Sequence, residues 1–161
     1  MKIRLAIGSL VFVQALVLVT AQGKTTADGV YSDAQAARGE AVYGKACASC
    51  HQADLSGDGQ TPALTGKDFN ADWTDQSLGD LFDRTRISMP ADKQGSLQPA
   101  EVADVLAGML KKTQFPAGQT ELPPDLAARK EIRYVGPTTQ APDCGKAGHQ
   151  PPTPRPPAHL H

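Results

Sequence analysis

Apolar side chains recur at helical spacing in residues 99–112. They occupy positions i, i+3, i+4, i+7 and i+8, which form one face of a helix: Val102, Val105, Leu106, Met109 and Leu110. Pro99 suits the first turn of this helix, and Lys111 and Lys112 favour the negative end of its dipole. The pattern predicts an amphipathic helix over 99–112 with one buried stripe.

A second helix is predicted over 33–46. Ser32 can cap its first turn, and Gln35 stands three residues later, at the position that completes a capping box. One face of this segment carries small and aromatic residues at helical spacing: Ala36, Gly39, Tyr43 and Cys47. These signals indicate a helix that runs up to the first cysteine of the chain.

A shorter helix is predicted over 78–86, with Ser77 as its cap and Asp80 as its third residue. Residues 51–76 show no clean periodicity and contain several turn residues: Gly57, Gly59, Pro62 and Gly66. A loop of this length inside a compact domain is usually functional or wraps around a ligand. Together the patterns predict an all-α fold with three main helices and one long loop.

The amino-terminal residues have the pattern of a secretory signal peptide. Lys2 and Arg4 precede an apolar run over 5–19, and small residues follow at 19–21, where such signals are cleaved. The alternative is a permanent membrane anchor, but the run is shorter than the ~20 residues that a spanning helix needs. We therefore expect residues 1–21 to be removed and the protein to be exported to the periplasm. Membrane attachment is expected only if this segment is retained.

The remaining chain divides by composition. Residues 22–31 are small and polar and are interpreted as a leader, and residues 32–125 are predicted to form the domain. Residues 137–161 hold seven of the chain's 13 prolines and few large apolar side chains, so they cannot bury enough surface to offset the entropy of ordering. We therefore expect residues 126–161 to be a largely disordered extension.

Charge and cysteine content narrow the classes of function. The formal net charge of −1 at pH 7 is close to balance, so nothing points to nucleic acid as a partner. Only 5% of the residues are aromatic, which indicates a core built from Leu, Val and Ala or around a group that is not protein. The three cysteines are an odd number, and Cys144 stands alone in the extension, so they do not form a disulfide framework.

Residues Cys47-Ala48-Ser49-Cys50-His51 form a C-x-x-C-H motif. Two thiols at this spacing can form thioethers with the two vinyl groups on one edge of a porphyrin, and the next residue, His51, is then held beneath the iron. A thioredoxin-like dithiol needs a βαβ context, and no strand is predicted before the motif. A zinc site needs four ligands, and the domain has no further Cys or His. The motif therefore predicts one covalently bound haem c.

Two methionines of the domain are candidates for the sixth iron ligand. Met109 lies on the apolar stripe of the last helix and is expected to be part of the core. Met89 follows the helix over 78–86, and Pro90 stops that helix and stiffens the chain where a ligand has to be presented. Ligation by His51 and Met89 would fill both axial positions of the iron, which leaves one-electron transfer as the chemistry.

The long loop also contains Asp54-x-Ser56-x-Asp58-Gly59, which is similar to the start of a calcium-binding loop. The twelfth position of such a loop would be Thr65 instead of Glu, and no pair of predicted helices flanks it. We therefore interpret this stretch as a plain turn, with calcium binding as the alternative.

Between residues 31 and 125 the chain resembles the class I cytochrome c family. It is most similar to the bacterial monohaem cytochromes that act as partners or domains of quinone-cofactor (PQQ) alcohol and sugar dehydrogenases. The matching stretches are 31–39, 43–51, 53–57, 62–64, 86–90, 115–118 and 121–123.

The resemblance implies a fold and several residue roles. The first and last helices of this family cross closely, and Gly39 would allow that contact; relatives often have an aromatic residue where this chain has Gly108. Pro62 matches the proline whose carbonyl accepts a hydrogen bond from the proximal His51. Three further residues are expected around the haem: Leu64 in the pocket, Trp73 either near the propionates or filling the core, and Arg86 either facing the propionates or on a solvated helix face.

The sequence thus predicts a monomeric electron carrier with no catalysis of its own. By resemblance, its donor would be a PQQ-type dehydrogenase in the periplasm, and its acceptor another cytochrome or a terminal oxidase. Two alternatives stay open. One is a haem sensor or haem enzyme in which a small ligand displaces Met89, and the other is a structural subunit of a dehydrogenase complex.

Overall fold

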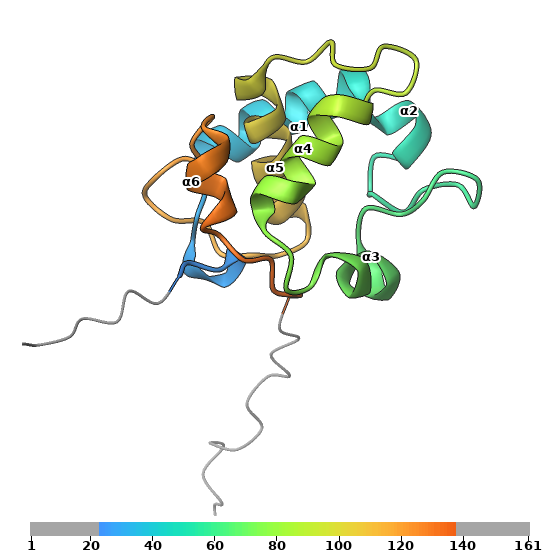
Figure 1. Cartoon of the computed structure of the whole chain (residues 1–161). Helices are drawn as coiled ribbons and strands as arrows, with labels where there is room; N and C mark the ends of the chain where they lie inside the picture. Colours follow the sequence, from blue (N-terminus) through green and yellow to red (C-terminus); the bar gives the residue numbers. More distant parts are fainter. Residues whose placement is uncertain (1–22, 138–161) are drawn as a thin grey trace, which may run out of the picture.

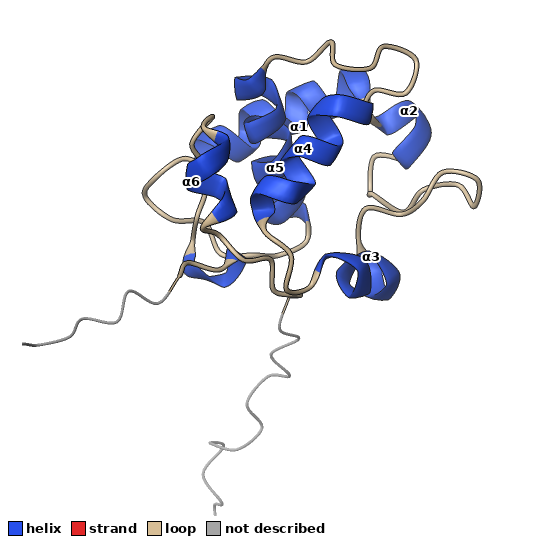
Figure 2. Ribbon diagram, viewed as in Figure 1, coloured by secondary structure: helices blue, strands red, loops and turns tan. Residues whose placement is uncertain are grey.

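The structure is a computed structural model that describes residues 23–137 of the 161-residue chain (Figure 1). Within these residues the backbone forms helices and isolated bridges but no strand, which confirms the predicted all-α fold (Figure 2). The elements are η1 (Thr26–Asp28), α1 (Asp33–Ala46), α2 (Ala48–His51), α3 (Gly66–Trp73), α4 (Leu78–Ser88), α5 (Pro99–Lys112) and α6 (Leu126–Lys130).

Some of the segments predicted from the sequence cannot be compared with the structure. The predicted signal segment 1–21, the part of the predicted extension that starts at residue 138, and Cys144 within it lie outside the described residues. In the described range 23–137, no helix has both the length and the apolar character needed to cross a membrane.

Helices α1 and α5 pack against each other at the centre of the molecule (Figure 1). They meet at two glycines. A Cβ atom built on Gly39 would lie 1.7 Å from the carbonyl oxygen of Asp104, and one built on Gly108 would lie 2.9 Å from the backbone nitrogen of Glu40. Both positions therefore exclude a side chain, because the two backbones approach too closely. The close crossing expected at Gly39 is confirmed. Gly108 on α5 is a second position at which the backbones of the two helices come this close.

The predicted apolar stripe of α5 is the main part of the core. Val102, Val105, Leu106 and Leu110 are each at most 3% exposed, and Met109 is 7% exposed. Helix α4 adds further buried apolar side chains to the same cluster: Leu78, Leu81 and Phe82. Burying each large apolar side chain contributes roughly 1.5–3 kcal/mol, so this stripe is a major source of stability.

The two predicted helix caps have different outcomes. At α4, Ser77 and Asp80 form the complete capping box. At α1, the Ser32 hydroxyl accepts the N–H of Gln35 at 3.1 Å, but the Gln35 side chain does not return the bond. Instead its amide nitrogen donates to the carbonyl of Leu122 at 3.0 Å, and its amide oxygen accepts the N–H of Leu122 at 2.7 Å. A buried amide is stabilised only when both its donor and its acceptor are satisfied, and Leu122 offers both.

The predicted long loop 51–76 is partly helical, because α3 lies within it. This helix has eight residues, and Phe69 is the one that it buries. Two turns with a single buried apolar residue carry no periodic signal, which is why the sequence pattern missed the helix.

The ordered domain is longer at both ends than the predicted range 32–125. In the expected leader, Thr26, Val30 and Tyr31 are buried. In the expected extension, α6 packs on α4, and the residues after it contribute Ile132 and Tyr134 to the core. The ends also bond each other: the N–H of Thr26 donates to the carbonyl of Arg133 at 3.1 Å. The expectation of a leader and of disorder from residue 126 is therefore wrong for residues 23–31 and 126–137.

Arg129 shows how firmly α6 is attached. Its side chain is fully buried, and its guanidinium carbon lies 3.3 Å from the centre of the Phe82 ring on α4. The guanidinium also donates to the carbonyl oxygen of Pro123. Two other guanidinium nitrogens, Nε and Nη2, have no hydrogen-bond partner, so the cost of burying the charge offsets part of the roughly 2 kcal/mol that such a ring contact contributes.

Truncation should distinguish the packed part of the extension from the rest. Ending the chain after Asp125 removes three buried residues, Arg129, Ile132 and Tyr134, and should lower the free energy of unfolding by at least about 3 kcal/mol, since loss of one large core side chain alone costs 2–5 kcal/mol. Ending it after Pro137 should leave the unfolding midpoint unchanged. Urea unfolding followed by circular dichroism measures both. Equal midpoints for the two truncations would contradict the structural role of residues 126–137.

Candidate functional site

The C-x-x-C-H motif lies at the junction of α1 and α2. Cys47 ends α1 with φ −125° and ψ −36°, and the chain then forms the single turn of α2. The carbonyl of Cys47 accepts the N–H of Cys50 at 3.1 Å and that of His51 at 2.9 Å. These two bonds close the turn, so that Cys47, Cys50 and His51 stay close together.

The two thiols of the motif differ in environment. Both are free; Cys47 is partly buried against the core, and Cys50 is exposed. Burial raises the pKa of the Cys47 thiol to about 11, and the neighbouring Cys50 adds to the shift. The Cys47 thiol is therefore protonated at neutral pH, and it lies on the core side of the motif, whereas the Cys50 thiol faces solvent.

His51 is held in one orientation and one tautomer. Its ring is buried, with 7% exposure, and Nδ1 lies 2.9 Å from the carbonyl oxygen of Pro62. Because a carbonyl oxygen can only accept, Nδ1 must carry the hydrogen, and Nε2 is the ring nitrogen left for a ligand bond. An imidazole oriented in this way is a good metal ligand when it is neutral. The structure thus contains the His51–Pro62 contact that the family resemblance implies.

The loop that carries Pro62 folds back on the motif. The hydroxyl of Tyr43 donates to the carbonyl of Gln52 at 2.9 Å, and the N–H of Gly57 donates to the carbonyl of His51 at 3.1 Å. Gln52 has a φ of 62°, an unfavourable conformation for a residue with a side chain, and the bond from Tyr43 holds it there. These bonds hold the loop that carries Pro62 in place next to His51.

The calcium-like stretch of this loop satisfies its own carboxylates. Asp54 accepts the N–H of Ser56 at 3.0 Å, and Asp58 accepts the N–H groups of Gln60 and Thr61 at 3.1 and 2.7 Å. Such bonds are typical of turns in which Asp caps the following backbone. Among residues 23–137, no group of three or more His, Cys, Asp or Glu side chains gathers closely enough to hold a metal ion.

Met89 is presented at the end of α4. It is the C-cap residue, and it has an extended backbone with φ −123° and ψ 153°, as the residue before a proline favours. Its side chain is partly buried, whereas Met109 is 7% exposed in the core of α5. The structure therefore places Met109 where the sequence predicted it, among core residues, and leaves Met89 at the edge of the domain.

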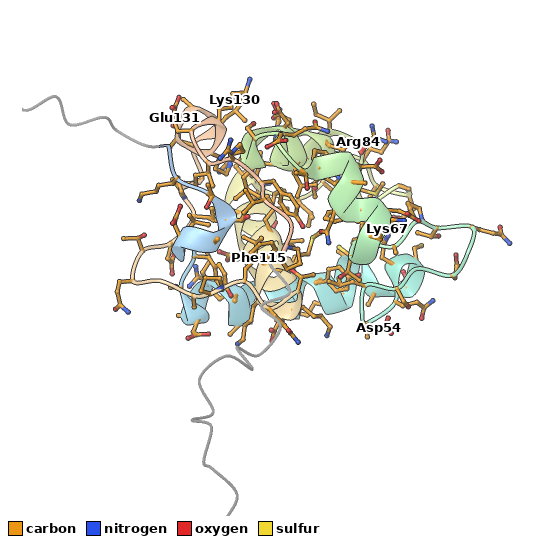
Figure 3. The ribbon with its side chains drawn as sticks, turned by 90° about the horizontal axis from the view of Figure 1, so that it is seen from below. Asp54, Lys67, Arg84, Phe115, Lys130 and Glu131 are labelled. Carbon is orange, nitrogen blue, oxygen red and sulfur yellow. The ribbon has the colours of Figure 1, made fainter. Side chains whose placement is uncertain are left out.

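Helices α2, α3 and α4 enclose one end of the molecule. In Figure 1, α2 and the carboxyl-terminal end of α4 lie at the same end, with α3 below them. In the view from below, Asp54 beyond α2 and Arg84 on α4 lie on opposite sides, and Lys67 of α3 lies between them (Figure 3). The proximal and distal candidates thus come from two elements at the same end of the molecule, α2 and the carboxyl-terminal end of α4.

A small apolar pocket of about 10 Å³ lies between Leu64, α3, α4 and α5. It is lined by Leu64, by Phe69 of α3, by Tyr134 and by residues of α4 and α5: Leu78, Leu81, Leu106, Met109, Leu110 and Thr113. Leu64 is the residue that the resemblance assigned to a pocket. Sequence reasoning missed Phe69 and Tyr134. The apolar residues Ile132 and Tyr134 on either side of Arg133 were a short signal for Tyr134, because such alternation is typical of an extended, half-buried segment.

The remaining two predicted residues are less central. Trp73 ends α3 and is partly buried, with its ring centre 6.2 Å from that of Phe69. Arg86 is 45% exposed, and its Nε lies 3.7 Å from the carboxylate of Asp83 on the same helix. This is the solvated helix face that the sequence left open as an alternative for Arg86. Their roles near a haem edge stay predictions.

The chain was also compared with known proteins. Residues 34–107 match the family model described as cytochrome C oxidase, cbb3-type, subunit III. This range runs from α1 into α5 and includes the C-x-x-C-H motif and Met89. No curated protein and no solved structure matches the chain. The match supports a c-type cytochrome domain, and with it haem binding and electron transfer.

Proposed function

We propose that this chain is an exported cytochrome that carries a single covalent haem c and transfers one electron at a time between proteins. The observation that carries the proposal is the turn Cys47–His51, which brings together two free thiols and an imidazole whose Nδ1 is bonded to the Pro62 carbonyl. That donor set suits haem attachment, and the family match over residues 34–107 supports it independently.

The residues around the motif fit such a group. Cys47 and Cys50 would hold it through thioethers, His51 through Nε2, and Met89 through its sulfur. The side chains around Leu64 and Phe69 would cover its apolar face. When bound, haem c supplies reversible one-electron oxidation and reduction at its iron.

The residues of the chain would then determine the surroundings of the haem iron. The Pro62 carbonyl orients His51 and keeps its Nε2 free to bind. Met89 would hold the iron through its sulfur together with His51 and would leave no place for a substrate, which supports a carrier instead of an enzyme. A haem sensor or haem enzyme, in which Met89 yields to a small ligand, is the alternative that the experiment below distinguishes.

The proposed partners are other redox proteins. The resemblance of the chain to cytochrome partners of PQQ-type dehydrogenases supports such a dehydrogenase as the donor. The matching family model is described as a subunit of a cytochrome c oxidase, which supports an oxidase as the acceptor. The apolar run over 5–19 supports export, and the protein is proposed to act as a monomer in the periplasm.

Solvent extraction and ligand binding test this function together. After expression with a haem-attachment system, acid–acetone treatment should leave the haem with the wild-type chain, because thioethers survive unfolding. The matched double variant Cys47→Ser, Cys50→Ser should release any haem into the acetone. Carbon monoxide should leave the spectrum of the reduced wild type unchanged if Met89 occupies the iron. Free extraction from the wild type would refute covalent attachment, and a prompt carbon monoxide spectrum would favour the sensor.

A further inference from the structure

Helix α3 is attached to the domain in an unusual way. The extensive helix–helix contacts of the described structure join α1 with α2 and α5, and α4 with α5 and α6, but they do not include α3. Phe69 is the residue that α3 buries. Helix packing alone therefore does not explain how α3 is held at the end of the molecule.

Tyr134, in the segment that follows α6, supplies the missing attachment. Its hydroxyl donates to the side-chain oxygen of Asn70 on α3 at 2.7 Å. Its backbone carbonyl accepts the N–H of Asp75 at 3.0 Å, and its N–H donates to the carbonyl of Gln76 at 2.8 Å. Its ring meets that of Phe69 edge-on, with 6.1 Å between the ring centres. One residue thus holds both α3 and the turn that ends it.

The same side chain is anchored in the core. Tyr134 is 2% exposed, and its ring also packs edge-on against Phe115, with 5.7 Å between centres. In Figure 1 the chain runs from α6 along the lower edge of the molecule to the turn between α3 and α4. Tyr134 therefore connects α3 to the core of the domain. Its ring is held between Phe69 of α3 and Phe115 of the core.

Helix α3 is in turn connected to the candidate haem site through Leu64 and Pro62, which precede it in the chain. Phe69 and Tyr134 line one apolar pocket together with Leu64. The helix starts at Gly66, soon after Pro62, whose carbonyl orients His51. A shift of α3 would open the apolar pocket to water and disturb the segment that carries the His51 acceptor.

We propose that Tyr134 is a positioning residue for the haem, and that its bond to Asn70 keeps α3 closed over the site and so raises the reduction potential. This inference rests on the proposed function. The physical reason is that an apolar, water-free surrounding favours the less charged ferrous state, so entry of water lowers the potential. The carboxyl-terminal segment, which composition alone assigns to a disordered extension, thereby controls the redox property of the domain.

The test uses four variants of the full chain: Tyr134→Phe, Asn70→Ala, the two combined, and Tyr31→Phe. The Tyr31 variant is a matched control, because Tyr31 is about as buried as Tyr134. Its hydroxyl donates to the carbonyl of Phe115 at 2.6 Å and not to a residue of α3. Covalent haem per chain, reduction potential, melting temperature and hydrogen exchange of the α3 amides are measured for each.

Tyr134→Phe and Asn70→Ala should each carry full haem, lower the reduction potential and speed hydrogen exchange in α3. The double variant should show no larger shift in potential than the single variants, because both remove the same bond. Tyr31→Phe should lower the melting temperature without a shift in potential. A haem-loaded Tyr134→Phe variant with the wild-type potential would overturn this inference alone. A wild-type chain without covalent haem would overturn the proposed function and this inference with it.

Discussion

Replacing Gly39 with alanine is expected to lower the free energy of unfolding by at least about 3 kcal/mol. The new Cβ would lie 1.7 Å from the carbonyl oxygen of Asp104, and backbone atoms cannot move aside as the end of a flexible side chain can. The helices α1 and α5 would have to separate, which disrupts the packing of the α5 stripe; overpacking of a core costs 1–3 kcal/mol and more when backbone has to shift. In a domain whose total stability is about 5–15 kcal/mol, this is a large fraction.

Gly44→Ala is the matched control for this prediction. Gly44 lies one to two turns further along the same helix, and a Cβ there would meet no atom within 4 Å. Alanine should be neutral there or stabilise the helix by up to about 1 kcal/mol, because glycine is the poorer helix former. Urea unfolding of both variants gives the comparison. Similar midpoints for Gly39→Ala and Gly44→Ala would mean that the two helices can separate without loss, contrary to the observed crossing.

Met89→Ala is expected to remove the weak absorption band that a sulfur–iron bond gives near the red edge of the visible spectrum of the oxidised protein. The reduction potential should fall at the same time, because a thioether ligand raises the potential. Met89 is the C-cap of α4 and only partly buried, so the variant should fold and attach haem normally. Optical spectra and redox titration of the purified protein measure both effects.

Met109→Ala separates ligation from packing. Met109 is 7% exposed and lies in the apolar stripe of α5, so its loss should lower stability by about 2–5 kcal/mol and leave the band in place. A band that survives in the Met89 variant would refute the assignment of Met89. A band that disappears only in the Met109 variant would transfer the ligand role to the core residue.

Much of the fold follows from signals that are local in the chain. The bounds of α1 and α5 agree with the predicted segments 33–46 and 99–112, because Ser32, Pro99 and the apolar stripe mark them within a few residues. Helix α4 ends two residues later than predicted, just before Met89 and Pro90. Caps, prolines and helical spacing depend on neighbours within one or two turns, so a sequence pattern can contain all of the relevant information.

Other elements could not be predicted in this way. Helix α3 buries one apolar residue, and the segment 126–137 is next to a proline-rich region that dominates its composition. These segments are ordered by contacts between residues far apart in the sequence, such as the bond from the Tyr134 hydroxyl to Asn70. A composition argument averages over the window and does not register a few buried side chains such as Ile132 and Tyr134.

The sequence by itself predicted the chemistry of this protein, because the order and spacing of Cys47, Cys50 and His51 along the chain are what identify the C-x-x-C-H motif. The orientation of the His51 ring, in contrast, depends on the Pro62 carbonyl. Only the tertiary structure decided which distant group each buried polar atom bonds: Leu122 for the Gln35 amide, and Asn70 for the Tyr134 hydroxyl. A buried donor or acceptor has to be satisfied, but several partners could satisfy it, and the packing of the whole domain selects one.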